Sequence, residues 1–258
     1  MEFETIIYEK RESVALIRLN RPHVLNAMNP QMWKDLSQAL DEVESDNEIK
    51  IMMITGVTTE KGKKTFSTGA DLKDSKERTI EEYRAYLKSL QEVSLRIIRF
   101  PKPTIAAING YALGSGYELA LACDIRIAAE DALIGSPEAR VSSSVTGGAT
   151  RLIIELIGIG KAKELLFTSD YITGAEAERI GLVNKAVPPE RLMDTAFEMA
   201  EKIAQNSPLS IRFIKENLDM ARTRSPKEMM DFEVEACLQT VFASERKGAL
   251  KNFESRKS

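Results

Sequence analysis

Two glutamates stand where a carboxylate could do chemistry. Glu118 lies in the first turn expected for a strongly apolar helix, and Glu138 follows 20 residues later, directly after Ser136 and Pro137. A carboxylate is expensive to bury unless it is paired or has a task. Two carboxyl groups that share one water can together supply a proton donor and a proton acceptor. Each residue also has a structural explanation, because an acid in the first turn of a helix compensates the helix dipole.

Glycine-rich turns precede these helices. Residues 109–124 join a buried strand to the apolar helix through three glycines, and that helix is expected to begin at Ser115 or Gly116. Glycine permits close backbone approach, and a helix start directs unpaired N–H groups outward, so an anion or a developing oxyanion is favoured there. Residues 65–72 form a second small-residue turn that could present N–H groups in the same way. Such turns are also common connections without any function.

Several function classes are excluded by composition. The formal net charge is −3 with both signs interspersed, so we expect neither a nucleic-acid nor a membrane partner. The glycines match neither a phosphate loop nor a dinucleotide fingerprint. A single histidine, His23, argues against a Ser-His-Asp triad and against a histidine-rich metal site, and no metal is expected. Cys123 and Cys237 lie far apart, and neither a targeting signal nor a spanning segment is apparent, which indicates a cytoplasmic protein.

The elements that must position these residues follow an α/β pattern. Short apolar runs at 14–17, 51–54, 104–108 and 125–128 predict strands, and a last strand is expected at 182–187. Helices are predicted at 30–45 and at 79–99, the second with Leu87, Leu90 and Leu95 toward the core. Strands separated by helices indicate buried, largely parallel pairing. After about residue 188 only helices are predicted, with more apolar positions than a small helical unit can hide, so packing on another subunit is expected.

Taken in order, five segments resemble the crotonase (enoyl-CoA hydratase/isomerase) superfamily. They are residues 19–27, 66–72, 109–118, 137–138 and 173–184, which read LNRP then LNA, FSTGADL, NGYALG then E, PE, and TGAEA then GLVN. The resemblance covers essentially the whole chain. It implies a crotonase-like spiral of ββα units with the acyl-CoA site in residues 1–195. It also implies a helical C-terminal oligomerisation region in residues 196–258, which forms homotrimers, commonly paired as hexamers.

The resemblance also implies the reaction and the roles of the site residues. In the family's hydratases, two backbone N–H groups, here those of Ala70 and Ser115, bind the thioester oxygen as an oxyanion hole. Glu118 is then the base that assists water, and Glu138 is the acid that protonates C2. The reaction is hydration of a 2-enoyl-CoA, or its reverse, as in β-oxidation and acyl-CoA degradation, and it needs no cofactor besides the CoA of the substrate. Substrate or CoA contacts are implied for His23, Val24, Leu25, Ala27, Ser67, Thr68, Gly69, Asp71, Leu72, Leu113, Gly114, Pro137, Val141, Thr146 and Lys251.

The sequence departs from the family pattern at two places. Ser115 stands where a glycine usually supplies the second oxyanion donor, and residues 142–148, SSSVTGG, replace the usual Pro-Gly stretch with one residue fewer. The second segment adjoins the acyl pocket in the family, so a cyclic or conjugated acyl group is considered beside a straight chain. Three alternatives stay open: an isomerase, a ring or thioester hydrolase, and a non-catalytic acyl-CoA-binding homologue.

Overall fold

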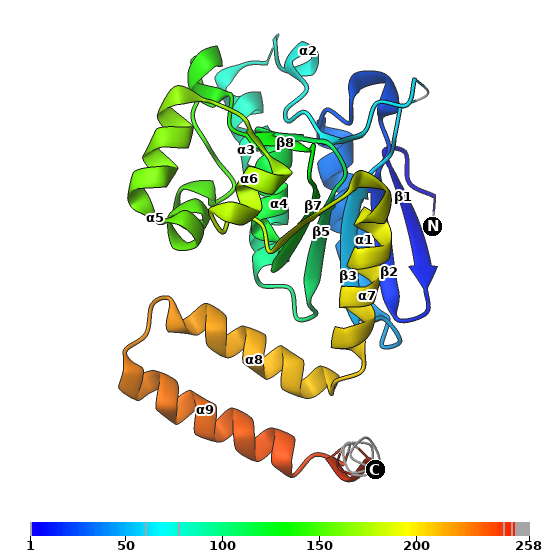
Figure 1. Cartoon of the computed structure of the whole chain (residues 1–258), viewed down its shortest axis with the longest axis vertical. Helices are drawn as coiled ribbons and strands as arrows, with labels where there is room; N and C mark the ends of the chain where they lie inside the picture. Colours follow the sequence, from blue (N-terminus) through cyan, green and yellow to red (C-terminus); the bar gives the residue numbers. More distant parts are fainter. Residues whose placement is uncertain (1, 60, 77, 245, 249, 251–258) are drawn as a thin grey trace.

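A computed structural model describes residues 2–59, 61–76, 78–244, 246–248 and 250 (Figure 1). Its strands form two sheets. The larger sheet has the order β1-β2-β3-β5-β7-β10, with bounds Ile6–Arg11, Val14–Leu19, Ile51–Gly56, Thr104–Ile108, Ile125–Ala129 and Lys185–Val187. The smaller sheet has the order β4-β6-β8-β9, with bounds Thr65–Ser67, Tyr111–Leu113, Leu133–Gly135 and Ile172–Thr173.

The pairing is largely parallel, as predicted. All neighbouring strands from β2 to β10 in the larger sheet are parallel, and only β1 pairs antiparallel. In the smaller sheet β4, β6 and β8 run parallel, and β9 closes the edge antiparallel. β3 and β5 are buried along their whole length, which is typical of strands covered on both faces.

The chain rises as a spiral. Each of three successive turns gives one strand to the larger sheet (β3, β5, β7), then one to the smaller sheet (β4, β6, β8), and then a helix. The helices that follow are α3 (Ile80–Ile98), α4 (Ser115–Ala122) and α5 (Ala149–Thr168). Equivalent points of successive turns therefore lie next to one another, which brings residues far apart in sequence to one place.

Two predictions about these elements need correction. Leu95 of α3 is 45% exposed rather than buried, because Tyr86, Leu90, Val93 and Ile97 form the core face at helical spacing. The last strand is shorter than predicted. Residues 182–184 follow α6 (Gly174–Arg179) instead, and the N–H of Leu182 donates to Ala177 across a positive-φ glycine, as in a helix C-cap.

The remaining helices cover the sheets or stand beside them. α1 (Pro30–Ser45) is capped by Asn29, whose side chain accepts from the N–H of Met32, and it packs on β1, β2 and α3. α7 (Leu192–Ala204) packs on β3, β5 and β7. The short helices are η1 (Pro22–Val24), α2 (Leu72–Ser75), η2 (Glu138–Val141) and η3 (Pro189–Arg191). In the described part of the chain, none of the helices has the length and apolarity that crossing a membrane requires.

The C-terminal helices α8 (Pro208–Ala221) and α9 (Pro226–Val241) form an antiparallel pair at one end of the molecule (Figure 1). α9 begins with the predicted capping box of Ser225 and Glu228. α8 has no buried residue among those described. Large apolar side chains are exposed on both helices and just after α9, namely those of Ile214, Leu218, Met230, Phe232, Val234, Leu238 and Phe242.

Candidate active site

Three consecutive turns of the spiral bring the predicted site residues together. Ala70 follows β4, Ser115 follows β6, and Glu138 follows β8. Because these three strands are parallel neighbours, their carboxyl ends meet at one edge of the smaller sheet. The N–H of Gly114 donates to the carbonyl of Gly135 at 3.1 Å, which joins the second and third turns at this edge.

Two backbone N–H groups at this edge have no hydrogen-bond acceptor among the described residues. Hydrogen bonds from Met28 to the Gly69 carbonyl (2.8 Å) and from Asp71 to the Met28 carbonyl (3.0 Å) leave the N–H of Ala70 outside that pairing. Ser115 is the first residue of α4, so its N–H has no acceptor within the helix. Neither N–H donates to any of the residues that the structure describes.

Gly69 allows the two donor segments to approach. Its φ is +92°, and a Cβ built there would lie 2.8 Å from the Leu113 carbonyl oxygen and 3.2 Å from the nitrogen of Ser115. A side chain at this position would therefore clash with the turn that carries the second donor. The pair of N–H groups can bind an oxygen that gains negative charge.

Glu118 lies in the first turn of α4 and is 2% exposed. Thr146 donates to both oxygens of its carboxylate: the N–H to Oε1, and the hydroxyl to Oε2 at 2.8 Å. The pKa of Glu118 is raised to about 7, chiefly by burial and to a smaller extent by the nearby charge of Glu138, while the two bonds from Thr146 act in the opposite direction. The carboxyl can thus exchange a proton near neutral pH.

Glu138 begins η2 and is half-buried. The hydroxyl of Ser136 donates to its Oε2. Its Oε1 lies over Gly114, where a built Cβ would be only 2.9 Å away. The N–H of Glu118 donates to the Gly114 carbonyl at 2.9 Å, which is the first backbone bond of α4. Gly114 therefore begins the helix that carries Glu118 and also lies under the carboxylate of Glu138.

Several of the predicted CoA contacts also lie together, on two hydrogen-bonded segments, residues 21–28 and 67–71. Thr68 donates to the Leu25 carbonyl through its N–H and its hydroxyl, both at 3.2 Å. Ser67 donates its hydroxyl to the Asn26 carbonyl at 2.7 Å. Arg21 pairs with Asp71 at 2.9 Å. This network places a mostly half-buried loop directly beside the Ala70 turn.

Other predicted contact residues lie at the surface. His23 is exposed on η1, Leu72 is 58% exposed and Val141 is 52% exposed. Leu113 and Pro137 flank the turns described above, and Lys251 lies outside the described residues.

From the sequence, Ser136 is predicted only as part of a helix start, although a hydroxyl two residues before an acid is well placed to donate a hydrogen bond to that acid.

Sequence reasoning also missed Ser94 of α3. Its side chain is 1% exposed, and its hydroxyl lies 3.2 Å from the position of a Cβ built on Gly147. The hydroxyl has no hydrogen-bond partner within the described part of the structure. Helical spacing could have placed it on the core face with Leu90 and Ile97.

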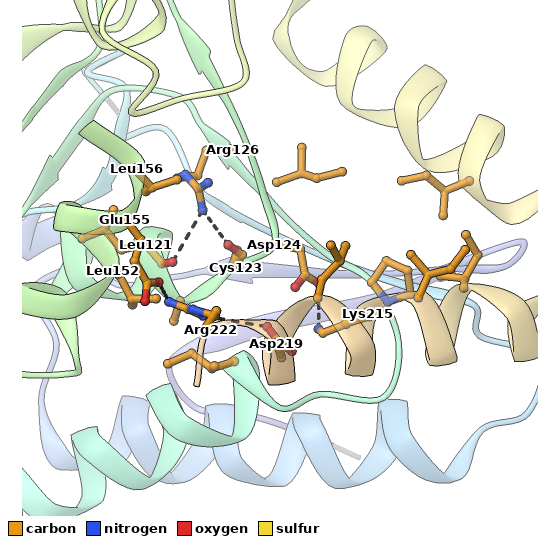
Figure 2. Close-up of a pocket in the computed structure, with 18 residues that line it drawn as sticks. Leu121, Cys123, Asp124, Arg126, Leu152, Glu155, Leu156, Lys215, Asp219 and Arg222 are labelled. Carbon is orange, nitrogen blue, oxygen red and sulfur yellow. Dashed lines mark hydrogen bonds and ion pairs between the residues drawn. The ribbon is translucent and has the colours of Figure 1, made fainter. Parts of the chain in front are cut away.

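A cavity of about 430 Å³ lies elsewhere, between the end of α4, α5 and α8 (Figure 2). Figure 2 shows the buried Arg126 turned toward the carbonyls of Leu121 and Cys123, which end α4. Lys215 of α8 pairs with Asp124 at 2.7 Å across the cavity. Neither Glu118 nor Glu138 lines this space, so it is separate from the candidate active site.

No cluster of three His, Cys, Asp or Glu side chains suited to a metal ion occurs among residues 2–59, 61–76, 78–244, 246–248 and 250. The polar groups that meet at the carboxyl edge of the smaller sheet are the two glutamates and the two backbone N–H donors.

Comparison with known proteins identifies the family. The sequence profile described as "Enoyl-CoA hydratase/isomerase" matches residues 9–258. The chain is similar to the short-chain-enoyl-CoA hydratase of Clostridium acetobutylicum, with 38% identity over 100% of this chain and 97% of that protein. It is also similar to the crotonyl-CoA hydratase of Syntrophomonas wolfei, with 36% identity over 100% of this chain and 98% of that protein. The chain belongs to the enoyl-CoA hydratase/isomerase family.

Solved structures agree with this assignment. The enoyl-CoA hydratase of Bacillus anthracis superposes with a TM-score of 0.93 at 33% identity, covering 98% of this chain and 97% of that chain. Pseudomonas aeruginosa DspI gives a TM-score of 0.92 at 32% identity, covering 99% and 96%. The predicted family and the predicted crotonase-like α/β fold are both confirmed.

Proposed function

We propose that this protein is a lyase that adds water across the double bond of a 2-enoyl-CoA thioester, with Glu118 and Glu138 as its acid–base pair. The observation that carries the assignment of the pair is the position of Gly114. The carboxylate of Glu138 lies over this glycine, and the helix that begins after it carries both Glu118 and the N–H donor of Ser115. The full-length similarity to enoyl-CoA hydratases supports the reaction class.

The chemistry begins at the thioester oxygen. Hydrogen bonds from the N–H groups of Ala70 and Ser115 draw electron density onto this oxygen and make C3 electrophilic. Glu118 accepts a proton from water as the oxygen of that water bonds to C3. The electron pair of the double bond moves toward the thioester, and Glu138 delivers its proton to C2. Water is consumed, and the two glutamates end with exchanged protonation states.

The CoA moiety is assigned to the hydrogen-bonded segments 21–28 and 67–71, next to the first oxyanion donor. Water and the thioester supply all the reacting atoms, so we infer that no further cofactor takes part. The acyl group is a straight chain, or a cyclic or conjugated group that contacts the segment containing Ser142, Ser143 and Ser144, which is exposed in the single chain.

We further infer that the protein works as a homotrimer or as a pair of trimers. The observation behind this is the apolar surface of α8 and α9, where Leu218 is 66% exposed and Phe242 just beyond α9 is 82% exposed. Apolar surface of this extent on a helix pair is typical of a subunit interface. A cytoplasmic location fits the two unpaired cysteines, Cys123 and Cys237.

The test is a mass-spectrometric screen of enoyl-CoA thioesters with straight, branched, aromatic and alicyclic acyl groups. Gain of one water with at least one of them is expected for the wild-type protein, and its loss for Glu118→Gln and Glu138→Gln. Glu130→Gln serves as the matched control, since Glu130 is exposed beyond β7. A product of unchanged mass with a moved double bond would replace hydration by isomerisation, and release of free CoA would replace it by hydrolysis.

A further inference from the structure

The segment that joins η2 to α5, residues 142–148, lies against the buried carboxylate of Glu118. Thr146 is its contact residue: the N–H reaches Oε1 and the hydroxyl reaches Oε2 at 2.8 Å. One residue therefore engages both oxygens of the carboxylate. Each oxygen has a second lone pair, so a water can still donate to Glu118 while Thr146 holds it.

The backbone of this segment is shaped for that contact. Gly147 and Gly148 have φ values of +56° and +81°, and the N–H of Ala149 donates back to the Thr146 carbonyl at 2.9 Å. A Cβ built on Gly147 would lie 3.3 Å from the Cβ of Glu118 and 3.5 Å from its Oε2. The backbone of Gly147 thus packs directly against the side chain of Glu118, with no room for a larger residue. This packing fixes the direction from which Thr146 approaches the carboxylate.

No cation among the described residues balances the charge of Glu118 in the interactions that shift its pKa. Glu138 of η2 raises the pKa of Glu118, and burial raises it most. Tyr86 from α3 and Tyr117 from α4 carry no positive charge near neutral pH, and burial raises the pKa of each. Only the two hydrogen bonds from Thr146 favour the charged form among the interactions that shift this pKa.

We propose that Thr146 is a positioning residue, whose hydroxyl holds the Glu118 carboxylate ionised and oriented toward the water. The inference rests on the proposed role of Glu118 as the base. During the reaction Glu118 gains the proton of water, and the Oε2–hydroxyl bond then weakens because a neutral carboxyl is a poorer acceptor. The hydroxyl is therefore of most use before the proton moves, when the free enzyme must present a carboxylate.

The test compares Thr146→Val, which removes the hydroxyl at nearly constant volume, with Thr146→Ser, which keeps it. Thr150→Val, at an exposed position on α5, controls for the loss of a threonine hydroxyl elsewhere in the same region. The pH profile of kcat/KM for a turned-over enoyl-CoA is recorded for each variant. The carboxyl resonance of Glu118 is followed by ¹³C NMR in glutamate-labelled protein and assigned by its absence in Glu118→Gln.

Loss of a hydrogen bond to a charged group corresponds to a shift of about one to two pKa units. In Thr146→Val we therefore expect the acidic limb of the profile, and the Glu118 titration itself, to move upward by that amount. Because the wild-type pKa of Glu118 is about 7, kcat/KM at pH 7 should fall about 5- to 50-fold, and most of the loss should be recovered at higher pH. KM should change less than about two-fold because the CoA segments are untouched. Thr146→Ser and Thr150→Val should keep the wild-type limb.

Two results would overturn the inference: an unmoved limb and titration in Thr146→Val, or the same shift in Thr146→Ser. Failure of the underlying function looks different. If Glu118→Gln retains wild-type turnover, the role of Glu118 as base is wrong, whatever the Thr146 variants do. If Glu118→Gln is inactive while Thr146→Val keeps the wild-type profile, the base assignment stands and only the positioning role falls.

Discussion

Gly114 lies under the carboxylate of Glu138 and directly before the helix that carries Glu118, so Gly114→Ala perturbs the placement of Glu138. The backbone there has φ +52° and ψ −125°, a conformation that residues with a side chain adopt only under strain of about 1–3 kcal/mol. The new methyl group would lie 2.9 Å from Oε1 of Glu138, so that carboxylate or the backbone must shift by about 0.5 Å to restore ordinary contact. A displacement of about 1 Å can cost on the order of 10²-fold in rate.

We therefore expect Gly114→Ala to lower kcat by about 10- to 100-fold and the melting temperature by roughly 2–10 °C. The assay is loss of enoyl-thioester absorbance, with thermal unfolding recorded in parallel. Two glycines provide controls. Gly62 also has a positive φ but has no atom near a built Cβ, and Gly160 has neither feature. Gly62→Ala should show modest strain alone, and Gly160→Ala neither effect. Near wild-type kcat in a folded Gly114→Ala protein would refute the placement of Glu138.

Three further outcomes follow from the structure. Because the pKa of Glu118 rises from 4.5 to about 7 on folding, the native state loses stability as pH rises through that range. Glu118→Gln should then be more stable than wild type by up to about 3 kcal/mol at pH 8 and by little at pH 4.5 in urea denaturation; an equal difference at both pH values would contradict this. Asp35→Ala should cost about 3 kcal/mol in the same assay, since it strands the buried N–H and hydroxyl of Thr5, each 2.7 Å from Oδ2; a loss under about 0.5 kcal/mol, as for an ordinary surface change, would count against it. If the protein forms the proposed trimer, Leu218→Glu should reduce it to monomers in analytical ultracentrifugation, and an unchanged mass would remove α8 from the proposed interface.

Most of the fold was predictable because its signals are local. The apolar runs at 51–54 and 104–108 became β3 and β5, since strands buried on both faces must be apolar throughout. Asn29 and Pro30 predicted the start of α1 through capping chemistry. The prediction for Leu95 is wrong because the buried face of α3 follows helical spacing through Leu90 and Ile97, and Leu95 lies off that face. The strand at 182–187 was drawn too long because a helix C-cap also buries apolar residues.

The geometry of the site depended on contacts that no local pattern reveals. The glycine turns could be seen in the sequence, and their order predicted the family, but the approach of the Glu138 carboxylate to Gly114 arises from the stacking of two spiral turns. Thr146 was predicted as a substrate contact, and the structure directs its two donors to Glu118. Such a bond depends on the path of a seven-residue connection with left-handed residues, which composition does not specify.

The central claim is that Glu118 and Glu138 act as one unit on a single water. The most direct test is a double-mutant cycle on kcat/KM for hydration of crotonyl-CoA, with Glu118→Gln, Glu138→Gln and the double variant. Groups that act as a unit are strongly non-additive. Each single change should lower kcat/KM by about 10³-fold or more, and the double variant should be slower than the worse single variant by less than about 10-fold. Losses that multiply, or a single variant within about 10-fold of wild type, would contradict the claim.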